Sequence, residues 1–190
     1  MESEQQSPQE TERYTEKEMF ERLRIASSKF NNDMNSLEVC IAADALVEDG
    51  ILGKRNYTEG PHNEDIYFVD DVEHGNVSSY RVLTIERVPD FHTGKGWKES
   101  SFTVKGYDDE GRVKSWLHKD SKSGRVLEKG SQTFFPNGNP QREEIFYDKF
   151  QNHKKEVLKY SEDNPKEVIY HEVTDNKTQK TEILVDSRKK

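Results

Sequence analysis

The segment Tyr107-Asp-Asp-Glu-Gly-Arg-Val113 is the first of six similar blocks that together decide the fold of this chain. Each block opens near a strand-forming residue, passes through turn formers such as Asp, Asn, Ser, Gly or Pro, and returns to a β-prone run. The blocks begin 13 or 14 residues apart, at Tyr107, Asp120, Phe134, Tyr147, Tyr160 and Thr174. That spacing accommodates one strand and one tight turn, so the blocks predict an antiparallel β-meander.

The region before these blocks continues the strand pattern. Two alternating segments, residues 66–72 and 77–88, flank Glu73-His-Gly-Asn76, where Gly and Asn favour a hairpin turn. A further strand is expected near residues 100–105. In all, the sequence predicts about nine antiparallel strands over residues 64–186.

Strict alternation along residues 77–88 predicts which side chains share a face of the sheet. One face should carry Tyr80, Val82, Thr84 and Glu86. The other face should carry Arg81, Leu83, Ile85 and Arg87.

Two helices are predicted before the strands. Thr15-Glu-Lys-Glu18 has the form of a capping box, and Asn35 with Glu38 repeats that relation. Apolar residues follow each box at helical spacing, and Gly50 is placed to end the second helix. The alternative for the second segment is a buried strand over residues 37–43, because short apolar runs fit either structure.

These elements predict a mainly β (α+β) fold in a single domain, residues 14–190. Residues 14–50 form its helical segment and residues 64–186 its meander. The helices should pack on the apolar part of the sheet, near residues 64–105. Residues 1–13 are acidic and polar, so we expect a disordered tail.

The composition indicates a thin hydrophobic core. Only 31% of residues are hydrophobic and 35% are charged, whereas soluble globular domains average about 45–50% apolar residues with Gly included. The nine Phe, eight Tyr and two Trp argue against a disordered chain. We therefore expect a sheet with much of both faces in contact with water.

The formal net charge of -8 comes from the first half of the chain. Residues 107–190 hold 17 Lys+Arg and 16 Asp+Glu, which leaves 12 and 21 of the totals of 29 and 37 for residues 1–106. An acidic half and a nearly neutral half provide no basic surface for a phosphate backbone. We predict no nucleic-acid partner.

The cysteine content and the hydropathy of the chain also indicate its cellular compartment. Cys40 is the only cysteine and has apolar neighbours, so it should be a buried small hydrophobic residue rather than half of a disulfide. The N-terminus lacks the basic start and apolar run of a signal peptide. No apolar stretch approaches the roughly 18 residues of a membrane helix. We predict a cytoplasmic protein with no membrane association.

No catalytic or metal-binding motif stands out. None of the six histidines has a metal-ligand spacing such as HExxH, and a metal site assembled from separate strands is the alternative. There is no G-x-S-x-G elbow. Thr93-Gly-Lys-Gly96 lacks the full phosphate-loop pattern and leads into a strand rather than a helix. We predict no catalytic residue, metal or cofactor, and we expect that the protein is not an enzyme.

The loop at residues 89–97 holds the one candidate cluster for binding a partner or ligand. The cluster combines ring surface with one cation and consists of Phe91, His92, Lys95 and Trp97. Aromatic anchors of this kind serve protein interfaces. The alternative is that Phe91 and Trp97 fold back and cap one end of the sheet.

Two motifs carry a resemblance to known repeat families. Gly106-Tyr-Asp-Asp-Glu-Gly-Arg-Val113 resembles the YD-type repeat, whose core is Tyr-Asp, two variable residues, Gly, Arg and an aliphatic residue. Phe134-Phe-Pro-Asn-Gly138, with Ile145-Phe-Tyr147 downstream, is similar to the MORN-variant hairpin repeats of some bacterial antitoxin-like proteins. The resemblance covers residues 102–186. It implies stacked strand-turn-strand units that bind or scaffold and that carry no catalytic residues.

We therefore predict a non-catalytic protein-binding module that uses the face or the edge of its sheet. The resemblance implies an antitoxin- or immunity-like role with a protein partner. The alternative is a closed up-and-down barrel around a small apolar ligand, which a meander of about eight strands can form. An enzyme is the third interpretation.

Overall fold

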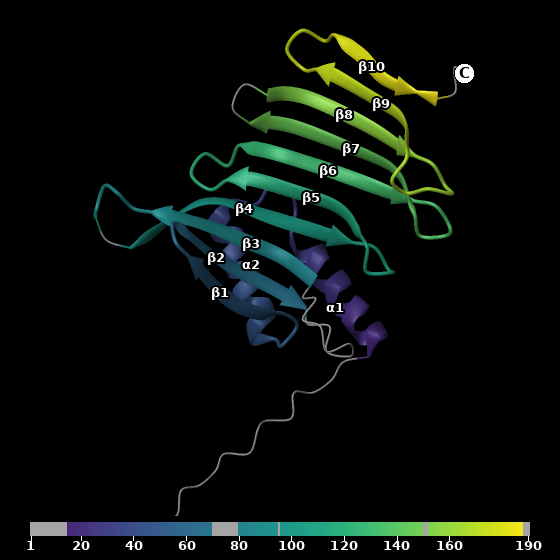
Figure 1. Ribbon diagram of the computed structural model, residues 1–190. Helices are drawn as coiled ribbons and strands as arrows, with labels where there is room; N and C mark the ends of the chain where they lie inside the picture. The colour runs from purple at the N-terminus through teal and green to yellow at the C-terminus, as the bar shows by residue number, and fades with distance from the viewer. Residues whose placement is uncertain (1–14, 70–79, 95, 150–151, 188–190) are drawn as a thin grey trace, which may run out of the picture.

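The computed structural model describes residues 15–69, 80–94, 96–149 and 152–187. Two helices precede a ten-stranded antiparallel sheet in which each strand pairs with the next one along the chain (Figure 1). The helices are α1 (Glu16–Lys29) and α2 (Ser36–Glu48). The strands are β1 (Gly53–Glu59), β2 (His62–Val69), β3 (Tyr80–Pro89), β4 (Trp97–Tyr107), β5 (Val113–Asp120), β6 (Val126–Phe134), β7 (Pro140–Lys149), β8 (Asn152–Tyr160), β9 (Val168–Asp175) and β10 (Thr181–Asp186). The predicted mainly β fold is confirmed.

Both helices begin at the predicted capping boxes. The Thr15 hydroxyl accepts a hydrogen bond from the Glu18 amide at 3.3 Å, and the Glu18 carboxylate accepts one from the Thr15 amide at 2.8 Å. Asn35 and Glu38 make the same reciprocal pair at 3.0 and 2.8 Å. Because α2 satisfies these amides and buries one stripe of its surface, residues 37–43 form a helix and not the alternative strand.

The helices cover only one end of the sheet. Figure 1 shows α1 and α2 behind the end that contains β1–β4, while no helix lies over β6–β10. We call the face that carries the helices the helix side, and the opposite face the open side. The core lies between α1, α2 and the strands from β2 to β4, close to the predicted region. Its buried residues are Met19, Leu23, Ala26, Val39, Ala43, Leu46, Leu52, Tyr67, Val69, Val82, Leu83, Ile85, Phe102 and Tyr107.

A β-bulge in β3 changes the predicted alternation. Tyr67 pairs with Leu83, but the next residue, Phe68, pairs with Arg81, so Val82 is an extra residue in β3. Val82 and Leu83 are both 0% exposed and belong to the same core cluster. The expectation that they lie on opposite faces is therefore wrong, because a bulge lets two consecutive residues oppose one residue of the partner strand.

Beyond β5 the molecule is a single layer. Within β6–β10 only Val157 is buried among the described side chains, and most other residues are partly exposed. Neither face of this part is covered by a helix in Figure 1. The expected sheet with both faces in contact with water is found here.

The predicted blocks coincide with the ends of strands. β4, β5, β6 and β8 end at the first residues of their blocks, and β7 and β9 end within two residues of theirs. The first three of these turns place a glycine at positive φ, at Gly111, Gly124 and Gly138. The turn between β9 and β10 uses Gln179 instead, at φ 57°. The spacing of turn residues thus located the turns correctly.

Some expectations are corrected and others lie outside the described residues. The meander begins at Gly53 rather than at residue 64, because β1 is an exposed polar strand without apolar alternation. The sheet is open, with β1 and β10 at opposite edges, so the alternative of a closed barrel is wrong. The predicted turn at residues 73–76 and the tail at residues 1–13 lie outside the described residues. No helix in the described part of the chain is long and apolar enough to cross a membrane.

Candidate functional site

The residues of the YD-like motif have structural roles. Tyr107 is buried, and its hydroxyl donates a hydrogen bond to the carbonyl oxygen of Arg81 at 2.7 Å. Its ring meets that of Tyr80 edge to face, with centroids 5.9 Å apart. Burial raises the pKa of Tyr107, so the phenol stays protonated and acts as a donor. This tyrosine fixes the end of β4 to β3.

Asp108 and Arg112 build the turn that follows. One Asp108 oxygen accepts hydrogen bonds from the amides of Glu110 and Arg112, and the other accepts the Arg112 guanidinium at 2.7 Å. Burial opposes ionisation of Asp108, but these hydrogen bonds prevail and hold its pKa below the usual value. The same guanidinium lies 4.3 Å from the centroid of the Phe134 ring. The motif therefore connects the β4–β5 turn to the end of β6. Its polar groups are used in contacts within the fold.

A partly buried polar network lies between β1, β2 and β3. Asp65 accepts hydrogen bonds from Arg87 at 2.7 Å and from Asn56 at 2.8 Å. Burial opposes ionisation of Asp65, but the Arg87 and Asn56 contacts hold its pKa below the usual value. The charges are compensated inside the protein, so the network fixes strand register and leaves no reactive group free.

The neighbouring Lys54 is also unsuited to nucleophilic chemistry. It lies 2.9 Å from Asp44 and 4.8 Å from the centroid of the Tyr67 ring, while the Tyr67 hydroxyl donates to Asp44 at 2.8 Å. Burial disfavours the charged form of Lys54, but its contacts with Tyr67 and Asp44 outweigh this and raise its pKa. A lysine held protonated cannot attack an electrophile. This group instead ties α2 to β1 and β2.

The remaining reactive side chains do not assemble a catalytic or metal site in the described residues. Burial, with Glu99 nearby, raises the pKa of the Cys40 thiol, which disfavours the nucleophilic thiolate. His153 pairs with Asp148, and His171 lies 3.4 Å from Glu156. No group of three or more His, Cys, Asp or Glu side chains in the described ranges could hold a metal ion.

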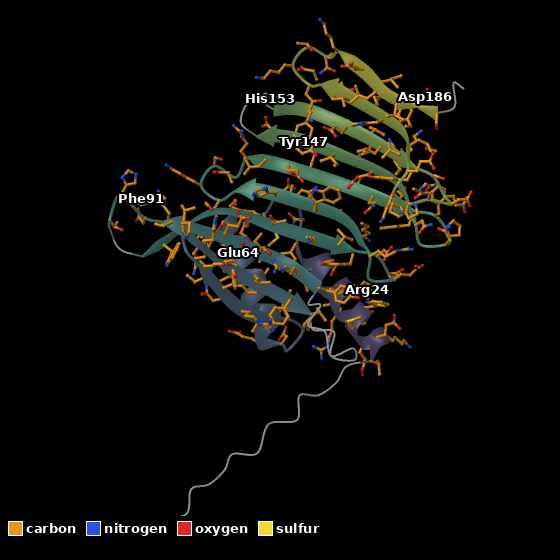
Figure 2. All side chains as sticks on the ribbon, viewed as in Figure 1. Arg24, Glu64, Phe91, Tyr147, His153 and Asp186 are labelled. Carbon is orange, nitrogen blue, oxygen red and sulfur yellow. The ribbon has the colours of Figure 1, made fainter. Side chains whose placement is uncertain are left out.

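The predicted binding cluster lies in the turn between β3 and β4. Phe91 is 85% exposed, and Figure 2 shows it at the tip of this turn, pointing away from the sheet. Trp97 is 39% exposed and pairs with Pro89 at the base of the turn. The His92 amide donates to Asp90 at 3.1 Å, and Lys95 lies outside the described residues. Phe91 therefore does not fold back as the alternative proposed.

The C-terminal edge of the sheet exposes a second apolar surface. β10 pairs with β9 alone among the described strands, so its outer edge is unpaired. Its three aliphatic residues, Ile183, Leu184 and Val185, are 47%, 51% and 38% exposed. Ile183 pairs with Glu172 on the helix side, and Val185 pairs with His171 on the open side. The edge thus presents apolar side chains above and below the plane of the sheet.

The opposite edge is built differently. β1 has the sequence Gly-Lys-Arg-Asn-Tyr-Thr-Glu, and every residue after Gly53 is exposed. Charged side chains on an edge strand discourage pairing with another chain. β10 carries two acidic residues, Glu182 and Asp186, and a bulge at Leu184, but it has no Lys, Arg or Pro and its central run Ile183-Leu-Val185 is apolar. Of the two edges, β10 is the one suited to accept another strand.

Comparison with known proteins adds no assignment. No protein-family model matches the chain, and no curated protein matches its sequence. The sequence interpretation selected the β3–β4 turn and overlooked β10. The signal for β10 was the uninterrupted apolar run Ile183-Leu-Val185.

Proposed function

We propose that the protein is a non-catalytic binding module that captures an extended segment of a protein partner at the free edge of β10. The observation that carries this proposal is the unpaired edge with three exposed aliphatic residues. A strand added to a sheet edge gains backbone hydrogen bonds, and side-chain pockets on either face supply specificity.

The register of β10 indicates the chemistry of the partner. An added strand would place alternate side chains beside Ile183 on the helix side and beside Val185 on the open side. A segment with apolar residues at consecutive positions would cover both. The resemblance to antitoxin-like hairpin repeats supports an antitoxin- or immunity-like role, and a cytoplasmic location belongs to the same proposal.

The test compares two edges of the same sheet. The partner is first identified by its co-purification with the protein from its own cells under native conditions. Binding is then measured with purified components. The double variant Ile183→Lys/Val185→Lys should weaken binding about tenfold or more, because it removes apolar contacts and places charges on the edge. Tyr57→Lys on β1 is the matched control, because Tyr57 is 49% exposed on the other edge.

Hydrogen exchange of the complex completes the test. Amides of β10 should exchange more slowly when the partner is bound, while those of β1 should not change. Equal affinity of the double variant and the wild type, or protection confined to another surface, would refute the proposal. Failure to recover any stoichiometric partner would also count against it.

The turn between β3 and β4 is a second candidate contact, favoured by the exposure of Phe91. Its four predicted residues, Phe91, His92, Lys95 and Trp97, could anchor the same partner. Phe91→Ala should then lower affinity without changing stability, because the ring makes little contact with the fold. An unchanged dissociation constant would remove this turn from the interface.

A further inference from the structure

A groove of about 550 Å³ opens on the helix side, where α1 ends and the single layer begins. We call it the helix-end groove. Residues at the end of α1 and just after it, including Ser27 and Phe30, form one wall. The floor is formed by β4–β8. Its volume lies within the range of about 300–1,000 Å³ that is typical of small-molecule sites.

Two neighbouring rows of paired residues make the floor. The first row runs across β4–β7 and begins with small residues, which hollow the surface; it consists of Gly106, Ser115, Ser131 and Glu144. The second row runs across β4–β8 and alternates apolar surface with cations; it consists of Val104, Leu117, Lys129, Phe146 and Lys155. The floor therefore combines an apolar strip with positive charge.

Lys129 is the distinctive group of this floor. Its strand neighbours in register, Leu117 and Phe146, are both apolar, and its ammonium lies 5.3 Å from the centroid of the Phe146 ring. Among the described residues, no carboxylate is within ion-pair distance of this ammonium. Lys129 is thus a cation on an apolar surface without a counter-charge in the described part of the chain.

The other charges on the floor do not compensate Lys129. Lys155 lies 3.0 Å from Glu144, and Arg142 donates to the same oxygen of Glu144 at 2.6 Å. Hydrogen bonding by Lys155, together with the charges of Lys155 and Arg142, lowers the pKa of Glu144 despite its partial burial. One carboxylate therefore already serves two cations, which leaves the groove with an excess of positive charge.

The wall offers a further polar group. The Ser27 hydroxyl is buried, and it has no hydrogen-bond partner among the described residues. A buried hydroxyl without a partner is unfavourable unless a ligand or water completes its bonding. Phe30, Asn31 and Asn32 complete this wall of the groove.

We propose that the helix-end groove binds a small amphipathic carboxylate. The apolar part of the ligand would lie on Val104, Leu117 and Phe146, and its carboxylate would pair with Lys129. Lys129 is exposed, so a neutral apolar molecule would gain no charge-assisted contact with its ammonium, and a polyanion would meet the ionised Glu144. A single negative charge on an apolar body satisfies both conditions.

Isothermal titration of the full chain with decanoate tests the proposal, with decanol and decyltrimethylammonium as probes of the same tail length. Decanoate should bind at one saturable site, and each of the other two probes should bind at least about tenfold more weakly, because neither can accept a charge-assisted hydrogen bond from the Lys129 ammonium. Equal binding of decanoate and decanol would overturn the proposal, as would the absence of saturable decanoate binding.

Two variants locate the site. Lys129→Met should weaken decanoate binding about tenfold. Lys154→Met is the matched control, because the Lys154 ammonium lies 5.2 Å from the centroid of the Tyr147 ring on the open side. Ser131→Trp should abolish binding by filling the groove, and it should fold because Ser131 is exposed. Equal losses in Lys129→Met and Lys154→Met would overturn the assignment.

Thermal unfolding of each variant keeps these outcomes interpretable. A variant that retains the wild-type melting temperature but loses decanoate binding reports on the groove. The Ile183→Lys/Val185→Lys edge variant should bind decanoate normally, because β10 contributes no residue to the groove. The groove and the edge proposal can therefore fail independently.

Discussion

The helix-covered strands and the single-layer strands belong to one ladder but are stabilised differently. In β2–β4, helices exclude water from one face, so that Leu83 and Phe102 are almost completely buried. In β7–β9, Val157 is the only buried residue among the described side chains. The first region depends on hydrophobic burial, and the second must depend on contacts between side chains of adjacent strands.

Those contacts combine rings with the alkyl stems of lysines. The ammonium groups of Lys129, Lys154 and Lys159 lie 5.1–5.3 Å from the ring centroids of Phe146, Tyr147 and Tyr170, respectively. A long lysine stem can cover apolar surface while its charge stays in water. An ordered sheet is therefore compatible with partial exposure of both faces. In β6–β9, contacts between lysines and aromatic rings take the place of the helices that cover β2–β4.

The largest expected change in the free energy of unfolding distinguishes the helix-covered strands from the single-layer strands. Phe102→Ala should lower the free energy of unfolding by about 3–5 kcal/mol, because it opens a cavity beneath the helices. Phe146→Ala, the matched change in the single layer, should cost roughly 1 kcal/mol or less. Urea denaturation of both variants measures the difference. Similar losses would mean that the single layer has no separate mode of stabilisation.

A smaller effect is expected in the polar network of the covered region. Asp65→Asn should cost about 3 kcal/mol at neutral pH, because it leaves Arg87 partly buried without its carboxylate. The control is Asp33→Asn in the exposed connection between the helices, which should have little effect. Chemical denaturation at pH 7 provides the measurement, and an equal cost for both variants would contradict a special role for Asp65.

The Asp65 carboxylate also determines the direction in which the free energy of unfolding changes with pH. Its pKa is lowered in the folded state, so its contribution is fully present above the unfolded-state pKa of about 3.9 and is lost as pH falls through the lower folded value. The free energy of unfolding of the wild type should therefore fall below about pH 4. Asp65→Asn should show a shallower fall, and an identical slope would exclude this linkage.

The next effect tests the close packing of a ring on the single layer. A Cβ atom on Gly130 would lie 2.1 Å from Cζ2 of Trp116, whose indole donates to Glu128 at 2.8 Å. Gly130→Ala should displace the ring and cost about 1–3 kcal/mol, with a change in tryptophan fluorescence. Ser131→Ala, at the adjacent exposed position, should change stability by no more than about 0.5 kcal/mol. Unchanged fluorescence in Gly130→Ala would show that the ring does not occupy this position.

The smallest effect concerns surface ion pairs. Lys155→Ala should cost no more than about 1 kcal/mol, because the lysine is partly solvated and Glu144 keeps Arg142 as a partner. The difference from the wild type should shrink at high salt, where exposed charges are screened. Denaturation at low and high salt checks this, and a large salt-independent loss would assign Lys155 a packing role.

Local signals in the sequence predicted the local structure. The capping boxes at Thr15 and Asn35 predicted where the helices begin, because a capping box is formed by two residues only three positions apart in the sequence. Turn formers spaced 13 or 14 residues apart located the ends of the strands from β4 to β9. A meander makes such prediction effective, since every strand pairs with its neighbour in sequence.

Features that depend on pairing register were missed. Nothing local in Val82-Leu83 signals a bulge, and the alternation rule separated two residues that share the core. The strand β1 has too few apolar residues to show a period. The helix-end groove requires Lys129, Phe146 and the end of α1 to meet, and only the folded ladder brings them together. The predicted cluster at Phe91 was found on an exposed turn, but its function stays a prediction.

Because every strand pairs only with its sequence neighbours, the sheet is modular in length. A further hairpin inserted after β10 would have to match only one existing edge, and no earlier contact would need to change. Quasi-one-dimensional proteins share this property, since each unit interacts mainly with adjacent units. Lengthening or shortening the sheet at β10 would therefore leave the pairing of the earlier strands, and their contacts with the two helices, unchanged.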